Sequence, residues 1–446
     1  MAYWLGVLVI PAMLAEMTIP QLGGTFSLKV VLVFVALAVF SVRSLRITRE
    51  YGVHVALVCA FVAVGLLWGG LSRYVLGELI NAAQALLFLP VLAAFLRSTG
   101  NEDRYVRDTA HVAVLLGVAV AVIAQGKFML LTQGVHFASL YGADGLYPLG
   151  TSLHVDYNVF ALGLLCALAC AMWLRNRPDT DAAMRWVCTA AVPFLAVTVI
   201  LSFSRRGVLL LTGLFVVQFF LRKRAASGYR RLVALLPALA AMLLVGLILA
   251  GLLFEIQNPV YTFAQSRVDL EGLTTRLQTI RQSDELTGSR LPRFEFAWVR
   301  FMDEYSIPQI LFGNGFSYLE DMGAAFDTSV GYDYPHNFLL SALLYGGLSQ
   351  TLVLCALIGG ALKYYTRNRS EFGPFLIMFV FSLFFGLSSS NSIYNVELLY
   401  LLLVMAAFPR SPRDPAPATG GERSWSRLGG KVGDAWPAGA ATIHVR

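Results

Sequence analysis

The residues best suited to chemistry are two pairs of arginines and one histidine, each beside the end of an apolar segment. The first pair lies in a short turn that reads Ser202-Phe203-Ser204-Arg205-Arg206-Gly207. Arginine forks match phosphate oxygens bidentately, and a helix that begins at this turn directs its free N–H groups and its dipole toward an anion. Snorkelling of both side chains to lipid headgroups is the alternative. We interpret Arg205 and Arg206 as a candidate phosphate site.

The second pair, Arg290 and Arg293, precedes Trp298 in a long polar segment between two apolar runs. Exposed arginines are common, so this pair alone is a weak signal. Together with the first turn, it suggests a two-sided clamp for a diphosphate.

His336 follows Pro335 where the next apolar run begins, and Asn337 stands beside it. The positive end of a helix disfavours an imidazolium ion, and a neutral imidazole can accept a proton near physiological pH. His336 is therefore a candidate general base. The alternative is a histidine that only caps and packs the helix.

Four further charged residues stand near the ends of apolar runs. Arg73 and Lys127 could extend an anion site, although snorkelling explains them better. Glu78 and Glu397 could orient a histidine or an arginine. We treat Arg73 and Lys127, together with Asn337, as secondary candidates.

Composition indicates an integral membrane protein. Of the 446 residues, 57% are hydrophobic and 14% are charged, and the mean hydropathy is +0.66, whereas soluble domains carry about 25% charged residues. The net charge of +7 comes mostly from basic residues between apolar runs, which is a topology signal and no indication of nucleic-acid binding. All five cysteines lie inside apolar runs and suggest packing.

Recognised cofactor and metal patterns are missing from the sequence. It has no His, Asp and Glu cluster with metal-ligand spacing, no Walker loop and no GxSxG elbow. We therefore predict no metal and no cofactor. A reaction here would use an activated donor that is already in the membrane.

Apolar runs long enough to cross a bilayer predict an all-α polytopic protein with twelve transmembrane helices. The first run lacks a basic n-region and is predicted to be a retained helix. The predicted spans are residues 3–20, 27–42, 53–71, 75–96, 109–127, 155–174, 186–202, 206–221, 232–254, 336–362, 372–388 and 393–408.

Basic residues concentrate in every second connection, so the positive-inside rule places both termini in the cytoplasm. The predicted organisation is then helices 1–9 in residues 1–254, an outward loop in 255–335, helices 10–12 in 336–408, and a disordered cytoplasmic tail in 409–446.

The outward loop is predicted to contain short helices. Residues 269–283 have a helical apolar face, and residues 291–304 carry Phe294, Trp298 and Phe301 at helical spacing. The second helix could pack against the bundle or lie in the membrane interface. We favour packing, and the two are compatible.

The order of these motifs resembles the O-antigen ligase/polymerase superfamily of bacteria. The resemblance covers residues 150–360 by motif and the remainder by topology. It rests on the sequences Ser202-Phe203-Ser204-Arg205-Arg206-Gly207, Leu311-Phe312-Gly313-Asn314-Gly315, His336-Asn337-Phe338-Leu339-Leu340 and Tyr345-Gly346-Gly347-Leu348.

The resemblance implies an inverting, metal-independent glycosyl transfer at the periplasmic face of the inner membrane. The donor would be O-antigen on undecaprenyl diphosphate, and the acceptor of a ligase would be the lipid A core. Arg205 or Arg206 and Arg290 or Arg293 would hold the diphosphate, while His336 would deprotonate the acceptor or orient the diphosphate.

We favour a ligase over an O-antigen polymerase or a protein O-glycosyltransferase. A lipid-glycan transporter is the alternative from another class, disfavoured because the sequence has no internal repeat. The sequence carries no signal for the oligomeric state.

Overall fold

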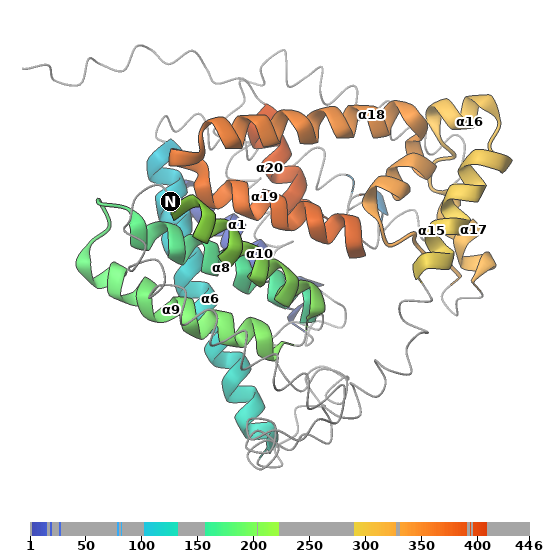
Figure 1. The fold of residues 1–446 in the computed structure, drawn as a ribbon. Coiled ribbons are helices and arrows are strands. Elements are labelled where there is room, and N and C mark those ends of the chain that lie inside the picture. The colour runs from blue at the N-terminus through green and yellow to red at the C-terminus, as the bar shows by residue number, and fades with distance from the viewer. Residues whose placement is uncertain are drawn as a thin grey trace, which may run out of the picture. The chain divides into compact units, whose positions relative to one another are not determined.

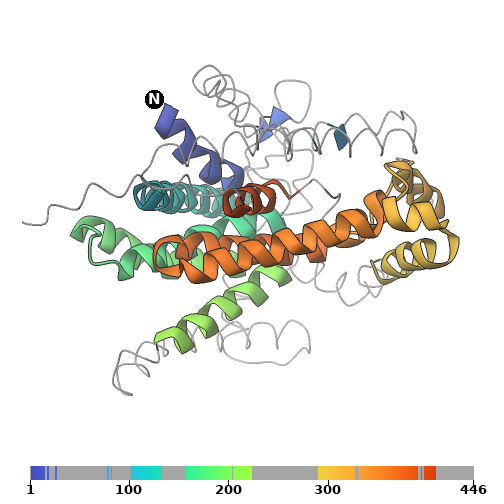
Figure 2. The same cartoon turned by 90° about the horizontal axis from the view of Figure 1, so that it is seen from above.

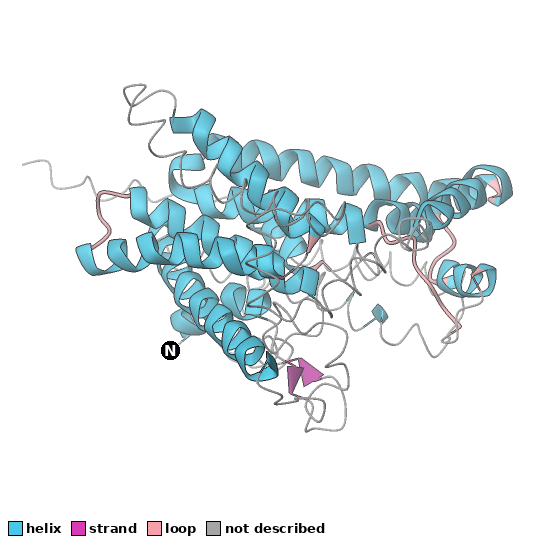
Figure 3. Ribbon diagram, turned by 60° about the horizontal axis from the view of Figure 1, so that its bottom comes forward, coloured by secondary structure: helices cyan, strands magenta, loops and turns pink. Residues whose placement is uncertain are grey.

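The computed structural model describes residues 2–15, 18–19, 26–27, 78–79, 82, 102–132, 157–202, 204–222, 290–326, 331–389, 393 and 396–407. In these residues every regular element is helical, apart from a two-residue ribbon in which β1 (Thr18–Ile19) pairs antiparallel with β2 (Phe26–Ser27) (Figure 3). An all-α membrane architecture is therefore supported.

Eight of the described helices coincide with predicted spans (Figure 1). They are α1 (Ala2–Ala15), α6 (Glu102–Thr132), α8 (Tyr157–Asn176), α9 (Ala182–Leu201), α10 (Arg205–Arg222), α18 (Phe338–Arg367), α19 (Arg369–Ser389) and α20 (Glu397–Ala407).

Five of these helices are long and apolar enough to cross a membrane: α6, α8, α9, α18 and α19. The predicted spans 27–42, 53–71 and 232–254, most of 75–96, the helix predicted at 269–283 and the tail 409–446 lie outside the described residues. The first helix was predicted to reach residue 20, which was wrong: it ends at Ala15, and the β-branched Thr18 and Ile19 form β1.

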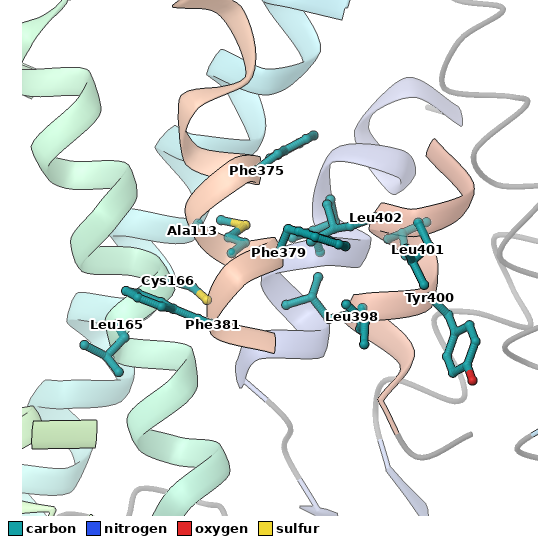
Figure 4. Close-up of a cluster of buried hydrophobic side chains, with 14 of the residues drawn as sticks. Ala113, Leu165, Cys166, Phe375, Phe379, Phe381, Leu398, Tyr400, Leu401 and Leu402 are labelled. Carbon is teal, nitrogen blue, oxygen red and sulfur yellow. The ribbon is translucent and has the colours of Figure 1, made fainter. Parts of the chain in front are cut away.

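Helix α8 forms the centre of the bundle and contacts α1, α6, α9, α10 and α19. Small residues allow this close packing, because a Cβ added to Gly117 or Gly163 would collide with α8 or α1 respectively. Figure 4 shows part of the core, where Phe381 of α19 points toward Leu165 and Cys166 of α8, and Phe379 points toward Leu401 and Leu402 of α20.

Contacts place the α8–α9 connection at the same end of the bundle as the starts of α6 and α19. Arg177 in the connection pairs with Asp103 at 2.9 Å and with Asp179 at 2.7 Å. Gly373 of α19 packs against Trp173 of α8. The predicted topology puts these connections on one side, which agrees with the structure.

The opposite end of the bundle carries the start of α8, the start of α18 and the end of α19. Ser204 donates a hydrogen bond of 2.9 Å to Asn158 in the first turn of α8. Asn337 donates one of 2.9 Å to the carbonyl of Leu387 in α19. The Ser202–Gly207 turn and His336 therefore share this end.

Four short helices precede α18: α15 (Arg290–Val299), the π-helical turn η3 (Arg300–Glu304), α16 (Ile307–Phe312) and α17 (Ser317–Ala325). The helix predicted at 291–304 is thus present as α15 and η3. Phe301 is buried and packs, while Trp298 is half exposed. The packing prediction holds for Phe301, whereas Trp298 of the same predicted face is exposed.

Helix α18 is broken at Gly347, whose φ is 62° and ψ is −161°. At the break, two carbonyls of α18 accept hydrogen bonds from outside the helix. The Asn314 N–H donates to the Leu344 carbonyl at 2.8 Å, and the Gly315 N–H donates to the Tyr345 carbonyl at 3.0 Å. The Leu311–Gly315 and Tyr345–Leu348 motifs are therefore one backbone interlock. Beyond the break, α18 runs beside α19 (Figure 2).

Candidate functional site

The Ser202–Gly207 turn is held by its two serines. Ser202 ends α9, and its hydroxyl donates to the Val199 carbonyl at 2.6 Å. Ser204 accepts a hydrogen bond of 3.0 Å from the Gly207 N–H and thereby caps α10. Both serines are fully buried. These bonds tie Ser202 and Ser204 to the adjoining helices, and α10 begins at Arg205, one residue before the predicted start at 206.

Arg206 has a buried nitrogen, Nη1, with no hydrogen-bond partner in the described structure. A buried donor without a partner costs about 1–3 kcal/mol, and more when the group is charged. An anion seated at this turn would remove that cost. The side chain of Arg205 lies outside the described residues.

Asp333 joins the second arginine pair to the histidine. Its Oδ2 accepts a hydrogen bond of 2.6 Å from Arg293 Nε, and its Oδ1 lies 3.9 Å from His336 Nε2. The Arg293 guanidinium also stacks over Phe326 at 4.6 Å. Asp333 is nearly buried, so it forms an ion pair of low exposure with Arg293, and the His336 ring lies beside this pair.

His336 has a positive φ of 55°, the one such non-glycine residue in the described part of the chain. A strained backbone of this kind costs about 1–3 kcal/mol and often marks a functional position. We placed His336 in the first turn of the helix, which was wrong, because α18 begins at Phe338.

Asn337 caps α18, since its side-chain oxygen accepts from Leu339 N at 3.0 Å and from Leu340 N at 3.2 Å. Capping is therefore done by Asn337 and leaves His336 for another role. The same Asn337 side chain also holds α19, so its visible role is structural.

A buried acid and two tyrosines surround the base of the loop. Burial raises the pKa of Tyr334 and of Tyr318, and the charge of the nearby Glu78 adds to both shifts. Both phenols stay protonated and act as neutral groups. Tyr334 also lies beside His336, with 6.5 Å between ring centroids. Glu78 thus lies close to these two tyrosines, and its role in orienting a histidine or an arginine stays a prediction.

The structure brings Arg293, Asp333, His336 and Asn337 together and puts the Arg206 turn at the same end of the bundle. No hydrogen bond or ion pair of the described residues links Arg206 to the other group. The side chains of Arg290 and Lys127, and all of Arg73, lie outside the described residues.

Both parts of this site fall inside one region that matches a protein-family model. Residues 189–355 match the family described as O-antigen ligase. This match supports the O-antigen ligase/polymerase superfamily for this region. No curated protein matches the chain.

Superfamily members are glycosyltransferase-like enzymes of lipopolysaccharide biosynthesis that use lipid-linked glycans, and this chain shares their membrane-helix character. The matched region begins in α9 and ends in α18, so it includes the turn at Arg206 and the cluster at His336.

Asp333 was not among the residues predicted for the site. An acidic residue three positions before a candidate base was a signal that could have been used, because it stands in the segment Tyr332-Asp333-Tyr334-Pro335-His336. Its bond to Arg293, forty positions earlier in the chain, was not visible in any local pattern.

Proposed function

We propose that the protein is an O-antigen ligase. It transfers O-antigen polysaccharide from undecaprenyl diphosphate to the lipid A core, at the periplasmic face of the bacterial inner membrane, with inversion and without a metal ion. The observation that carries this proposal is the buried, unpartnered Nη1 of Arg206 at a capped helix start, inside a region that matches the O-antigen ligase family.

The reaction would proceed by displacement at the anomeric carbon of the donor. An acceptor hydroxyl attacks that carbon from the face opposite the diphosphate, so one C–O bond forms while the other breaks. His336 takes the hydroxyl proton as general base, or orients the diphosphate. The product is a glycoside of opposite anomeric configuration and free undecaprenyl diphosphate.

Arginines would stabilise the leaving group. Negative charge grows on the diphosphate as the C–O bond breaks, and preorganised cations lower the barrier by meeting this charge. Arg206, with Arg205 beside it, forms one side of the clamp, and Arg290 or Arg293 forms the other. A bidentate fork suits phosphate oxygens better than a lysine would.

Asp333 would act as a positioning residue in this scheme. Asp333 accepts its hydrogen bond from Nε of Arg293. The terminal nitrogens of the same guanidinium would then bind the anion. The same carboxylate faces Nε2 of His336 and would favour the imidazolium that forms after proton uptake. One carboxylate thereby sets the spacing of a cation and a base.

The proposal is tested with purified protein in detergent, undecaprenyl-diphosphate glycan, and lipid A core, with EDTA and without nucleotide. A larger lipopolysaccharide is expected only when the acceptor is present. Longer lipid-linked glycan from donor alone would replace the ligase with an O-antigen polymerase. Transfer to a protein acceptor only would indicate a protein O-glycosyltransferase.

A transporter would give a different result. Folded protein that forms no product but moves lipid-linked glycan across vesicles would overturn the enzymatic proposal. Loss of transfer in EDTA that returns with added metal would overturn metal independence.

A further inference from the structure

Helix α16 packs one side against α18 and exposes large apolar side chains on the other. Ile307, Leu311 and Phe312 are 75%, 45% and 53% exposed. Three large exposed apolar residues in a helix of six are unusual for a surface in water. No function assigned above uses this face.

The backbone interlock fixes the position of α16 along the axis of α18. Asn314 and Gly315, just after α16, bond the carbonyls of Leu344 and Tyr345. Lys363 is the first basic residue toward the other end of α18. A bilayer core is spanned by about 20 helical residues, and counting back from Lys363 over that length reaches the level of Leu344. Helix α16 therefore lies at the outer boundary of the hydrocarbon core.

Several polar groups at both ends of α16 bond within the protein. At its start, Gln309 Oε1 accepts from the Ser306 N–H at 2.9 Å and from the Ser306 hydroxyl at 2.8 Å. At its end, the Gln309 amide donates to Asn314 Oδ1 at 3.0 Å. Non-helical backbone is tolerated at membrane depth only where protein satisfies it, and these bonds lower the cost of placing the segment there.

The apolar surface continues onto the membrane span itself. Directly after the break, α18 exposes Leu348, Leu352 and Val353. This part of α18 belongs to a helix long and apolar enough to cross the bilayer. If the helix spans the membrane, its exposed side chains meet lipid. The α16 face adjoins that surface at the interlock.

We propose that α16 is embedded in the outer leaflet of the bilayer, with Ile307, Leu311 and Phe312 in contact with lipid acyl chains. The occupant of this face is lipid rather than a second protein, because the neighbouring exposed surface of α18 is lipid-facing. The inference does not rest on the glycosyltransferase assignment.

The test uses full-length protein in vesicles of phosphatidylcholine and phosphatidylglycerol. Exposed Cys355 is replaced by serine, and single cysteines are introduced as Leu311→Cys, Ile307→Cys and the control Glu320→Cys. Glu320 is an exposed acid on α17 in the same loop. Each variant is labelled with an environment-sensitive fluorophore, and the labelled Cys355→Ser parent gives the background.

Quenching by aqueous iodide is compared with quenching by spin-labelled lipid. At Leu311 and Ile307 we expect several-fold weaker iodide quenching and stronger lipid quenching than at Glu320. Iodide quenching at both α16 sites as strong as at Glu320 overturns the proposal. Protection from both quenchers also overturns it, since a protein partner would then cover α16. A variant that loses its monodisperse elution is replaced by the other α16 site.

Discussion

Replacing Gly347 with alanine should weaken the interlock between α16 and α18. Gly347 has a φ of 62°, a region that costs a non-glycine residue about 1–3 kcal/mol. A Cβ at this position would lie 2.6 Å from the carbonyl oxygen of Ile310. That oxygen is backbone and cannot move cheaply, so overpacking adds about 1–3 kcal/mol.

These contributions sum to a loss of about 2–6 kcal/mol in the free energy of unfolding. The matched control is Gly360→Ala in the same helix, where a Cβ meets nothing within 4 Å and φ is helical. Alanine exceeds glycine in helix propensity by up to about 1 kcal/mol. The control should therefore be neutral or stabilising.

Thermal unfolding in detergent, followed by tryptophan fluorescence, measures the difference. At about 2 °C per kcal/mol, Gly347→Ala should melt about 4–12 °C below wild type, and Gly360→Ala at or above it. A Gly313→Ala change should also destabilise, and the double variant with Gly347→Ala should lose less than the sum, because both changes disrupt one contact. A Gly347→Ala protein that melts no lower than Gly360→Ala would refute the interlock.

The remaining predictions concern charged groups. Asp333→Asn breaks a nearly buried pair with Arg293 and should lower the free energy of unfolding by about 3–5 kcal/mol, which denaturation measures. The same change should shift the pH profile of glycan transfer, measured as rates, whereas a purely structural role would leave that profile in place. Arg206→Lys should slow transfer without lowering the melting temperature, because the fork is lost while Nη1 had no protein partner. The Arg177 guanidinium lowers the pKa of Asp179 to about 2, so this pair stabilises the fold above about pH 4 and its contribution is lost as pH falls through 2. Asp179→Asn should therefore show a smaller fall in melting temperature between pH 5 and pH 3 than wild type.

The spans were predictable because a helix in lipid needs length and an apolar surface, and both can be read from composition. The predicted range 206–221 corresponds to α10 (Arg205–Arg222), and 372–388 to α19 (Arg369–Ser389). The boundary at His336 was not predictable, because a histidine and an asparagine in succession both suit a helix start. Only backbone geometry shows that Asn337 caps and that His336 is strained.

The site was predictable residue by residue but not in its connections. The sequence named Arg293 and His336 without indicating that Asp333 joins them. The motifs around Gly313 and Gly347 were also visible in the sequence. Their contact was not, because it depends on the break in α18 at Gly347. Long-range pairing of this kind leaves no periodic trace in a single sequence.

The central claim is that glycan transfer depends on the arginine turn and on His336. The most direct measurement is the rate of transfer to lipid A core by purified wild type, His336→Ala, Arg206→Ala and the control His111→Ala, whose histidine lies within α6 and is not among the candidate site residues. We predict loss of transfer in the first two variants and near wild-type rates in the control, with all four proteins folded. Wild-type transfer by both His336→Ala and Arg206→Ala would contradict the account.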